Sequence, residues 1–334
     1  MEFFTEVEIP PCSWKIDYQS GVALMGSCFT ENIGQQLSGL KFSVDLNPFG
    51  ILYNPVSIGN SLKLLMQPRQ FTAADLFFDR GAWNSFYHHS RFSGANCEQV
   101  LNTINQQLQQ SSLFLENARF LFLTFGTAWV YEWAQTKQVV SNCHKLPARE
   151  FHRYRLTVDE IVTTYRTLLY DLRKFNPNIK IVFTVSPIRH WKDGAIENQR
   201  SKATLLLAVD QIVKKHGGEL CYYFPSYEIL MDELRDYRFY ASDMLHLSDT
   251  ATEYIYSRFS RSMVSDDSLK LAEEVLKIRK AAMHRPFNPA SGEYRKFLLY
   301  NLRQIDRLTE NFPFLNFEIE KTYFQDELTR FVSE

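Results

Sequence analysis

The sequence predicts an α/β fold: a mostly parallel, flavodoxin-like sheet between two layers of helices, with a helical segment at the C-terminus. Short apolar segments alternate five times with longer segments of helical periodicity, the pattern of a doubly wound sheet. The strand segments are nearly continuous apolar runs, as expected of parallel strands covered on both faces. We expect strands at residues 22–25, 42–46, 119–124, 180–185 and 220–224.

Helix-start signals follow several of these strands. Asn54-Pro55 combines an N-cap residue with proline at the first helical position. Thr157 and Glu160 have the spacing of a capping box, and Ser248 precedes another amphipathic segment. We expect helices at residues 29–37, 55–65, 98–112, 158–172, 198–215 and 249–259. Residues 68–97 and 139–147 show neither periodicity, so we expect irregular loops with a functional role there.

Residues 263–334 differ in character from the rest of the chain. Apolar positions at helical spacing mark two helices, at residues 269–283 and 294–308, with a break at 286–292. The pattern does not sustain three heptads, so it does not predict a coiled coil. We therefore divide the chain into an α/β domain, residues 1–262, and a C-terminal helical appendage, residues 263–334.

Composition limits the classes of function. The chain has 334 residues, a formal net charge of −1 and 45% hydrophobic residues. The near-zero net charge shows no excess of basic residues of the kind that binds nucleic acid. No apolar run approaches the roughly 20 residues that a membrane-spanning helix needs. The N-terminus lacks a basic segment followed by an apolar core, and the five cysteines are scattered. We expect a cytoplasmic protein that acts on a small molecule, with its oligomeric state open.

The turn after the first predicted strand carries residues that can act as nucleophiles. Val22 to Met25 is apolar, Gly26 interrupts the run, and apolar residues then recur every four positions. Ser27 and Cys28 therefore lie where a strand ends and a helix begins, at the sheet edge where ligands bind. Free N–H groups and the positive end of the helix dipole favour a thiolate or an oxyanion there. Either Cys28 or Ser27 can be the nucleophile.

A candidate base lies far along the chain, just before a capped helix. Asp243 and His246 are three residues apart. This spacing lets the carboxylate hold the Nδ1–H of the imidazole and leaves Nε2 free to accept a proton. Asp243 would then orient His246, and His246 would act as the general base for either nucleophile.

The segment Gly26-Ser27-Cys28-Phe29 resembles the signature of the GSCFA family, with Thr30 in place of its final alanine. That family is similar in outline to the SGNH, or GDSL-type, hydrolases, whose nucleophile follows the first strand and whose Asp-x-x-His motif lies late in the domain. The order holds over about residues 20–262. The resemblance implies an SGNH-type three-layer fold, with Cys28 at the nucleophile position and Asp243 and His246 completing a triad.

The resemblance also implies donors for an oxyanion. Gly50 follows the second strand, and Gly126-Thr127-Ala128 follows the third. Ala128 stands where SGNH enzymes have an asparagine donor, so Thr127 or Asn142 would have to replace it. Each glycine can equally be a turn residue at the end of a strand.

Polar residues in the long loops complete the candidate site. His89 and His144 lie in stretches typical of the GSCFA family and would line a substrate pocket, whereas His88 fits a surface histidine. Arg189 follows the fourth strand and would either bind a substrate anion or be solvated. No Cys-x-x-Cys, His-Glu-x-x-His, Walker-type or Gly-x-Gly-x-x-Gly motif is present, so we expect no metal and no cofactor.

These observations predict a hydrolase (esterase) or acyl transferase acting on an ester-type substrate, such as an acylated carbohydrate. The alternative is a non-catalytic module that binds a ligand on the same fold. Because an oxyanion donor is worth about 10²–10³ in rate, the missing asparagine implies a rearranged oxyanion hole or weak hydrolysis.

Overall fold

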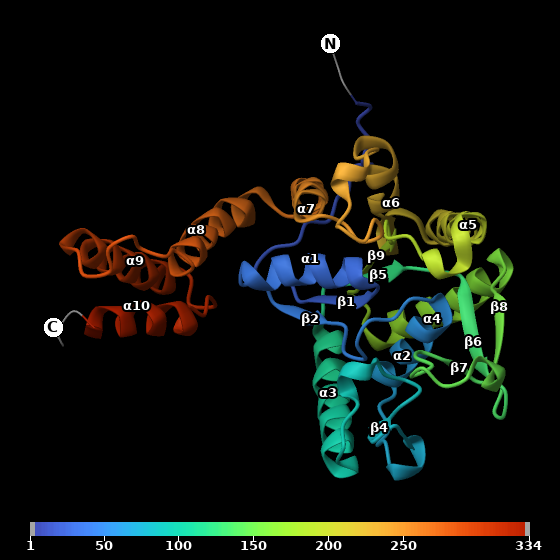
Figure 1. Cartoon of the computed structure of the whole chain (residues 1–334). Helices are drawn as coiled ribbons and strands as arrows, with labels where there is room; N and C mark the ends of the chain where they lie inside the picture. The colour runs from blue at the N-terminus through green and yellow to red at the C-terminus, as the bar shows by residue number, and fades with distance from the viewer. Residues whose placement is uncertain (1–3, 331–334) are drawn as a thin grey trace.

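The computed structural model describes residues 4–330 and confirms the predicted α/β architecture, with a parallel five-stranded sheet at its centre (Figure 1). The strand order β2-β1-β5-β9-β10 is the flavodoxin-like order. All neighbouring pairs run parallel, so the carboxyl ends of all five strands share one edge. The strands are β1 (Val22–Gly26), β2 (Val44–Leu46), β5 (Phe120–Phe125), β9 (Lys180–Val185) and β10 (Cys221–Tyr223).

Helices cover both faces of this sheet. Successive strand residues point to opposite sides, so Val22 and Leu24 join one core while Ala23 and Met25 join the other. The first core includes α1 (Cys28–Gly39) and α7 (Asp249–Met263). The second includes α2 (Pro55–Met66), α3 (Cys97–Asn117), α4 (Val158–Phe175) and α5 (Gly194–Leu220). A short helix, α6 (Ser226–Glu228), follows β10.

The C-terminal segment forms an arm that projects from the α/β body (Figure 1). It contains α8 (Asp266–Ala282), α9 (Gly292–Asn311) and α10 (Glu318–Arg330). An ion pair of 2.7 Å between Lys41 and Glu320 joins arm and body. The sequence predicts only the first two of these helices, because α10 buries just Glu320 and Phe324 and has little apolar periodicity.

Two small antiparallel sheets lie outside the five predicted strands, and three of their strands fall in stretches where the sequence predicts irregular structure. The first pairs β3 (Phe77–Asp79) with β4 (Ala82–Asn84), and the second has the order β7-β6-β8. Its strands are β6 (Trp129–Trp133), β7 (Val139–Val140) and β8 (Phe151–Arg155). The expectation of wholly irregular loops at 68–97 and 139–147 is therefore wrong. These strands are short and half-buried, so they lack the apolar run that identifies the central strands.

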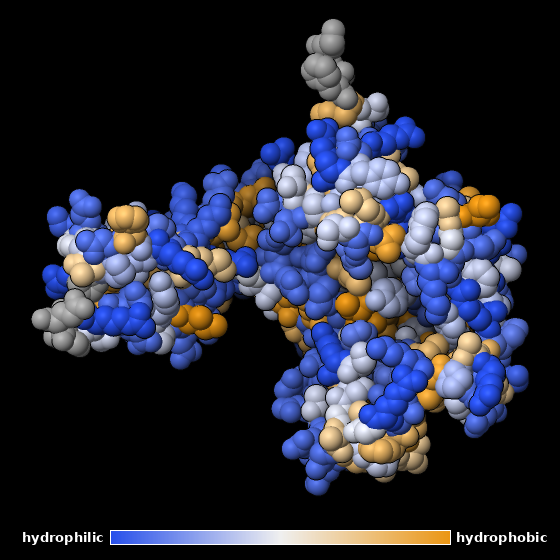
Figure 2. Space-filling view, viewed as in Figure 1, coloured by the Kyte–Doolittle hydropathy of each residue, from blue (hydrophilic) through white to orange (hydrophobic). Residues whose placement is uncertain are grey.

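Hydrophilic residues cover most of the surface of arm and body in the view of Figure 2. No helix within residues 4–330 is both long enough and apolar enough to cross a membrane. The ends of the two predicted domains, residues 1–3 and 331–334, lie outside the described part of the chain.

Candidate functional site

The turn after β1 is set by Gly26. Its φ is +150°, and a Cβ there would lie 2.4 Å from the carbonyl oxygen of Thr124 on the neighbouring strand. Only glycine fits so close an approach in this backbone region. Ser27 then caps α1: its Oγ accepts the N–H of Phe29 at 3.3 Å, and the residue is 2% exposed. The serine hydroxyl is thus occupied in starting the helix.

Cys28 is the first residue of α1 and is half-buried. Its Sγ lies 3.7 Å from the hydroxyl oxygen of Tyr53. Burial, together with the nearby Cys28, raises the pKa of Tyr53, so the phenol stays protonated at neutral pH and can donate a hydrogen bond. The backbone of Tyr53 is fixed because its carbonyl accepts N–H groups of Gly126 at 2.8 Å and Thr127 at 3.0 Å. Sequence reasoning missed Tyr53, which carries no motif of its own.

Asp243 and His246 form the hydrogen-bonded pair that their spacing suggests. Nδ1 of His246 lies 2.6 Å from Oδ2 of Asp243, and Oδ1 accepts the N–H groups of Leu245 and His246, each at 2.9 Å. These hydrogen bonds, with that from the imidazole first, lower the pKa of Asp243 to about 2. The carboxylate is therefore charged at neutral pH and orients the ring. Both side chains are about half exposed.

One cavity of about 350 Å³ receives both the thiol and the imidazole. Helix α1 supplies one wall, and the loop before α7, α7 itself and α8 supply the others. Ser27 is not among the residues that line it. The lining residues are Cys28, Asn32, Gln35, Gln36, Ile188, His246, Leu247, Asp249, Thr252 and Arg279.

The N–H groups suggested as oxyanion donors are used elsewhere. The N–H of Gly50 donates to the carbonyl of Asn47 at 2.7 Å, and those of Gly126 and Thr127 hold Tyr53. The hydroxyl of Thr127 pairs with that of Ser201 at 3.1 Å. Among the described residues, neither these groups nor Asn142 lines the cavity of Cys28.

The loop histidines form a separate cluster. His144 Nε2 lies 2.8 Å from the carbonyl of Ser85, and the N–H of His144 donates to Oδ1 of Asn142 at 2.9 Å. His89 packs on Gly50, whose φ is +79° and where a Cβ would lie 2.2 Å from that of His89. Burial lowers the pKa of both His89 and His144. None of these side chains lines the Cys28 cavity in the described structure.

The expectation that His88 is a surface histidine is wrong. The residue is 2% exposed, and its ring stacks on Phe49 with a centroid distance of 4.9 Å. Its Nδ1 lies 2.9 Å from the hydroxyl of Ser85. Burial lowers the pKa of His88 to about 3, so the ring is neutral and belongs to the core.

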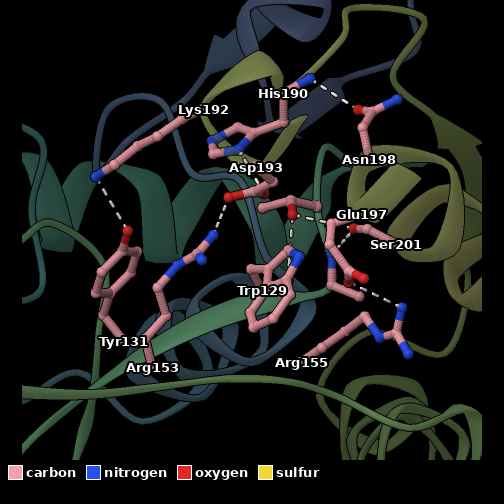
Figure 3. Close-up of polar contacts among 12 residues, drawn as sticks. Trp129, Tyr131, Arg153, Arg155, His190, Lys192, Asp193, Glu197, Asn198 and Ser201 are labelled. Atoms are coloured by element: carbon pink, nitrogen blue, oxygen red, sulfur yellow. Dashed lines mark hydrogen bonds and ion pairs between the residues drawn. The ribbon is translucent and has the colours of Figure 1, made fainter. Parts of the chain in front are cut away.

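A second histidine–aspartate pair lies beyond β9 (Figure 3). Nδ1 of His190 is 2.9 Å from Oδ2 of Asp193, whose side chain is 1% exposed and is also paired with Arg153. The ring of His190 lies edge-on to Tyr53, with a centroid distance of 6.2 Å. Arg189, considered above for anion binding, instead donates to the carbonyl of Met244 and stacks on Tyr240. It therefore holds the loop that carries His246.

A buried lysine ties two strand ends together. Nζ of Lys202 donates to the carbonyls of Gly126 at 2.8 Å and Ser186 at 2.6 Å, after β5 and β9 respectively. The residue is 1% exposed, and burial lowers its pKa to about 7. Nothing in the sequence distinguishes Lys202 from other lysines on an amphipathic helix. Among residues 4–330, no group of three or more His, Cys, Asp and Glu side chains is arranged to hold a metal ion.

Fold and site define a three-layer α/β protein with a thiol at the first strand–helix turn and, lining the same cavity, a histidine that is hydrogen-bonded to an aspartate. The chain belongs to the GSCFA family, whose model matches residues 21–259. The model of the GSCFA domain protein C-terminal domain matches residues 275–330, within the helical arm. No curated protein matches the chain significantly.

Proposed function

We propose that the protein is an SGNH-like hydrolase or acyl transferase that acts on an ester-type substrate, with Cys28 as the nucleophile. The observation that carries this proposal is the single cavity lined by both Cys28 and His246, from turns more than two hundred residues apart. Ser27 is the weaker candidate, because its hydroxyl caps α1 and is buried outside the cavity. The likeness to SGNH hydrolases in the order of these motifs supports the reaction class.

The reaction follows from the roles of three side chains. Nε2 of His246 accepts the thiol proton, while Asp243 holds Nδ1 and stabilises the imidazolium. The Cys28 thiolate attacks the ester carbonyl, and a C–S bond forms as the carbonyl oxygen becomes an oxyanion. Collapse of this intermediate breaks the C–O bond, and the alcohol leaves with the proton from His246. Water or an acceptor hydroxyl, deprotonated by His246, then cleaves the thioester.

Tyr53 is the donor we propose in place of the missing asparagine. Tyr53 is not among the residues that line the cavity, but its hydroxyl lies 3.7 Å from Sγ, within reach of a carbonyl that the thiolate attacks, and its phenol is protonated at neutral pH. The N–H of Cys28 is a second donor, because N–H groups in the first turn of a helix have no intrahelical acceptor. Two donors aimed at one oxygen form the minimal oxyanion hole.

The test is turnover of short-chain aryl esters and thioesters by the native protein and by Cys28→Ala and His246→Ala. We expect each variant to lose at least about 10²-fold in kcat, since general-base catalysis contributes about 10²–10⁴. Cys97→Ala is the matched control for the thiol: Cys97 is half-buried and is the first residue of α3, with its own N-cap, but lies outside the cavity.

His190→Ala is the matched control for the base, because His190 also has an aspartate on Nδ1. Loss of turnover in His190→Ala with retention in His246→Ala would reassign the base. A native protein that turns over no ester, yet binds acylated carbohydrate equally in all variants, would instead be a binding module.

A further inference from the structure

The cavity of Cys28 is a groove that runs along one face of α1. Cys28, Asn32, Gln35, Gln36 and Gly39 follow at the spacing of neighbouring helical turns, so they share one side of the helix. At about 1.5 Å per residue, the eleven residue steps from Cys28 to Gly39 correspond to about 16 Å. The groove therefore extends well beyond the space that a small acyl group fills.

The far end of the groove carries a cation from the helical arm. Arg279 is in the last turn of α8 and lines the cavity. Its guanidinium lies against the end of α1: a Cβ on Gly39 would come within 2.3 Å of Nη1 and 2.7 Å of Cζ. The negative end of the α1 dipole favours a cation at this place.

The guanidinium of Arg279 has no bound counter-charge. Among residues 4–330, no hydrogen bond or ion pair is made by this side chain. Within the described part of the chain, Asp249 is the one carboxylate lining the groove, and it lies three residues from His246 on the segment that forms the catalytic end. Arg279 thus offers its N–H donors to the groove, with no carboxylate of residues 4–330 within 4 Å.

The side chains between the two ends are amides. The side chains of Asn32, Gln35 and Gln36 make no hydrogen bond to other described residues, so their amide donors and acceptors are open to the groove. Amides at this spacing match hydroxyl, ether or amide groups along an elongated molecule. Arg279, in contrast, has the planar fork that matches an oxyanion such as a carboxylate or a phosphate.

We propose that the groove binds an elongated ester whose polar chain ends in an oxyanion group about 16 Å from the scissile carbonyl, and that Arg279 binds this group. The inference rests on the proposed function for the ester, but the anion site stands on the geometry of the groove. It gives the C-terminal arm a specific role, because α8 completes the substrate site of the α/β body.

Turnover is the first test. The probes are 4-nitrophenyl esters with an oligo(ethylene glycol) acyl chain of about this length, ending in a carboxylate, a phosphate or a neutral carboxamide. We expect the native protein to favour one of the anionic probes by about tenfold in kcat/KM, since a hydrogen bond to a charged group contributes about 1.5–3 kcal/mol and 1.4 kcal/mol corresponds to tenfold. The better of the carboxylate and phosphate probes identifies the anion.

Arg279→Gln should abolish this preference, while Lys280→Gln, which removes the same charge from the next residue of α8, should retain it. Gly39→Ala keeps the charge but displaces the guanidinium, so it should weaken the preference without affecting the neutral probe. This second variant stays informative if Arg279→Gln folds poorly. Equal rates on anionic and neutral probes in the native protein overturn the proposal.

Alkylation of Cys28 separates failure of this inference from failure of the proposed function. It requires no turnover, and the other four cysteines serve as internal references. Non-hydrolysable amide analogues of the same probes should slow iodoacetamide labelling of Cys28 when they end in an anion, and Arg279→Gln should remove that protection. If no ester is hydrolysed but this protection is seen, the anion site stands and the hydrolase does not. If esters are hydrolysed but neither assay distinguishes anionic from neutral probes, the anion site is wrong.

Discussion

The thiol of Cys28 lies 3.7 Å from the hydroxyl of Tyr53, and this contact links the start of α1 to the loop that precedes α2. Two backbone N–H groups, of Gly126 and Thr127, hold the carbonyl of Tyr53 in place. Gly126 and Thr127, two of the residues that the sequence suggests for the oxyanion hole, therefore act on the site through Tyr53. A protonated phenol in this position can stabilise both a thiolate and the oxyanion that forms when the thiolate attacks.

Tyr53→Phe tests this role. Removal of the hydroxyl should lower kcat by roughly 10²–10³ with little change in KM, because the donor acts mainly on the transition state. It should also slow alkylation of Cys28 near neutral pH, since the thiolate loses a hydrogen-bond donor. Tyr131→Phe is the control, because the hydroxyl of Tyr131 contacts Lys192 instead. Unchanged kcat in Tyr53→Phe would remove Tyr53 from the oxyanion hole.

Ser27→Ala and Cys28→Ala should separate helix capping from chemistry. Loss of the Ser27 cap should lower the free energy of unfolding by about 1 kcal/mol, measured by urea denaturation, while turnover remains. Cys28→Ala should abolish turnover with little loss of stability, because the residue is half-buried and its side chain is small. The opposite pattern would make Ser27 the nucleophile and would place the reactive hydroxyl in a buried cap.

The central sheet could be predicted because its strands are buried on both faces. Phe120 to Phe125 is apolar at nearly every position, and all six residues are buried. The antiparallel strands β6 and β8 mix aromatic and polar residues at mostly half-buried positions, so no apolar run marks them. Long apolar runs reveal parallel strands, whereas short strands at a surface depend on partners that are distant in the sequence.

The site was predictable only in part, for a similar reason. The turn at Cys28 and the pair Asp243–His246 each have a local pattern, and the order of strands places both at one edge of the sheet. Tyr53, Arg279 and Lys202 have no such pattern. Tyr53 depends on N–H groups seventy residues away, and Arg279 depends on the packing of α8 against the end of α1.

Lys202 predicts a specific pH dependence of stability. Its pKa is lowered by burial to about 7 in the folded state, against 10.5 for the ordinary side chain. Between these values the unfolded chain binds the additional proton, so the free energy of unfolding should rise with pH, by up to about 1.4 kcal/mol per unit. Below pH 7 the lysine is charged in both the folded and the unfolded state, so it does not change the free energy of unfolding with pH.

Urea denaturation at several pH values between 7 and 10 measures this effect. Lys202→Met should remove most of the increase in the free energy of unfolding with pH. Lys215 is an exposed lysine on the same helix, so Lys215→Met should leave this increase unchanged. Lys202→Met should also lower overall stability, because the carbonyls of Gly126 and Ser186 lose their donor. An identical pH slope in the native protein and Lys202→Met would show that the ammonium keeps its charge when buried.

Gly26→Ala tests the close approach of β1 and β5 on which the first turn depends. A Cβ at Gly26 would lie 2.4 Å from the carbonyl oxygen of Thr124 and 2.9 Å from Oγ1 of Thr30, in a backbone region that alanine rarely adopts. Backbone of a central strand cannot move aside without breaking the sheet, so we expect a loss of roughly 2–4 kcal/mol in the free energy of unfolding. Gly292→Ala, where a Cβ meets no atom within 4 Å, should change stability by less than about 1 kcal/mol. If both variants unfold at the same urea concentration, the turn tolerates a side chain, and the position of Cys28 does not depend on Gly26.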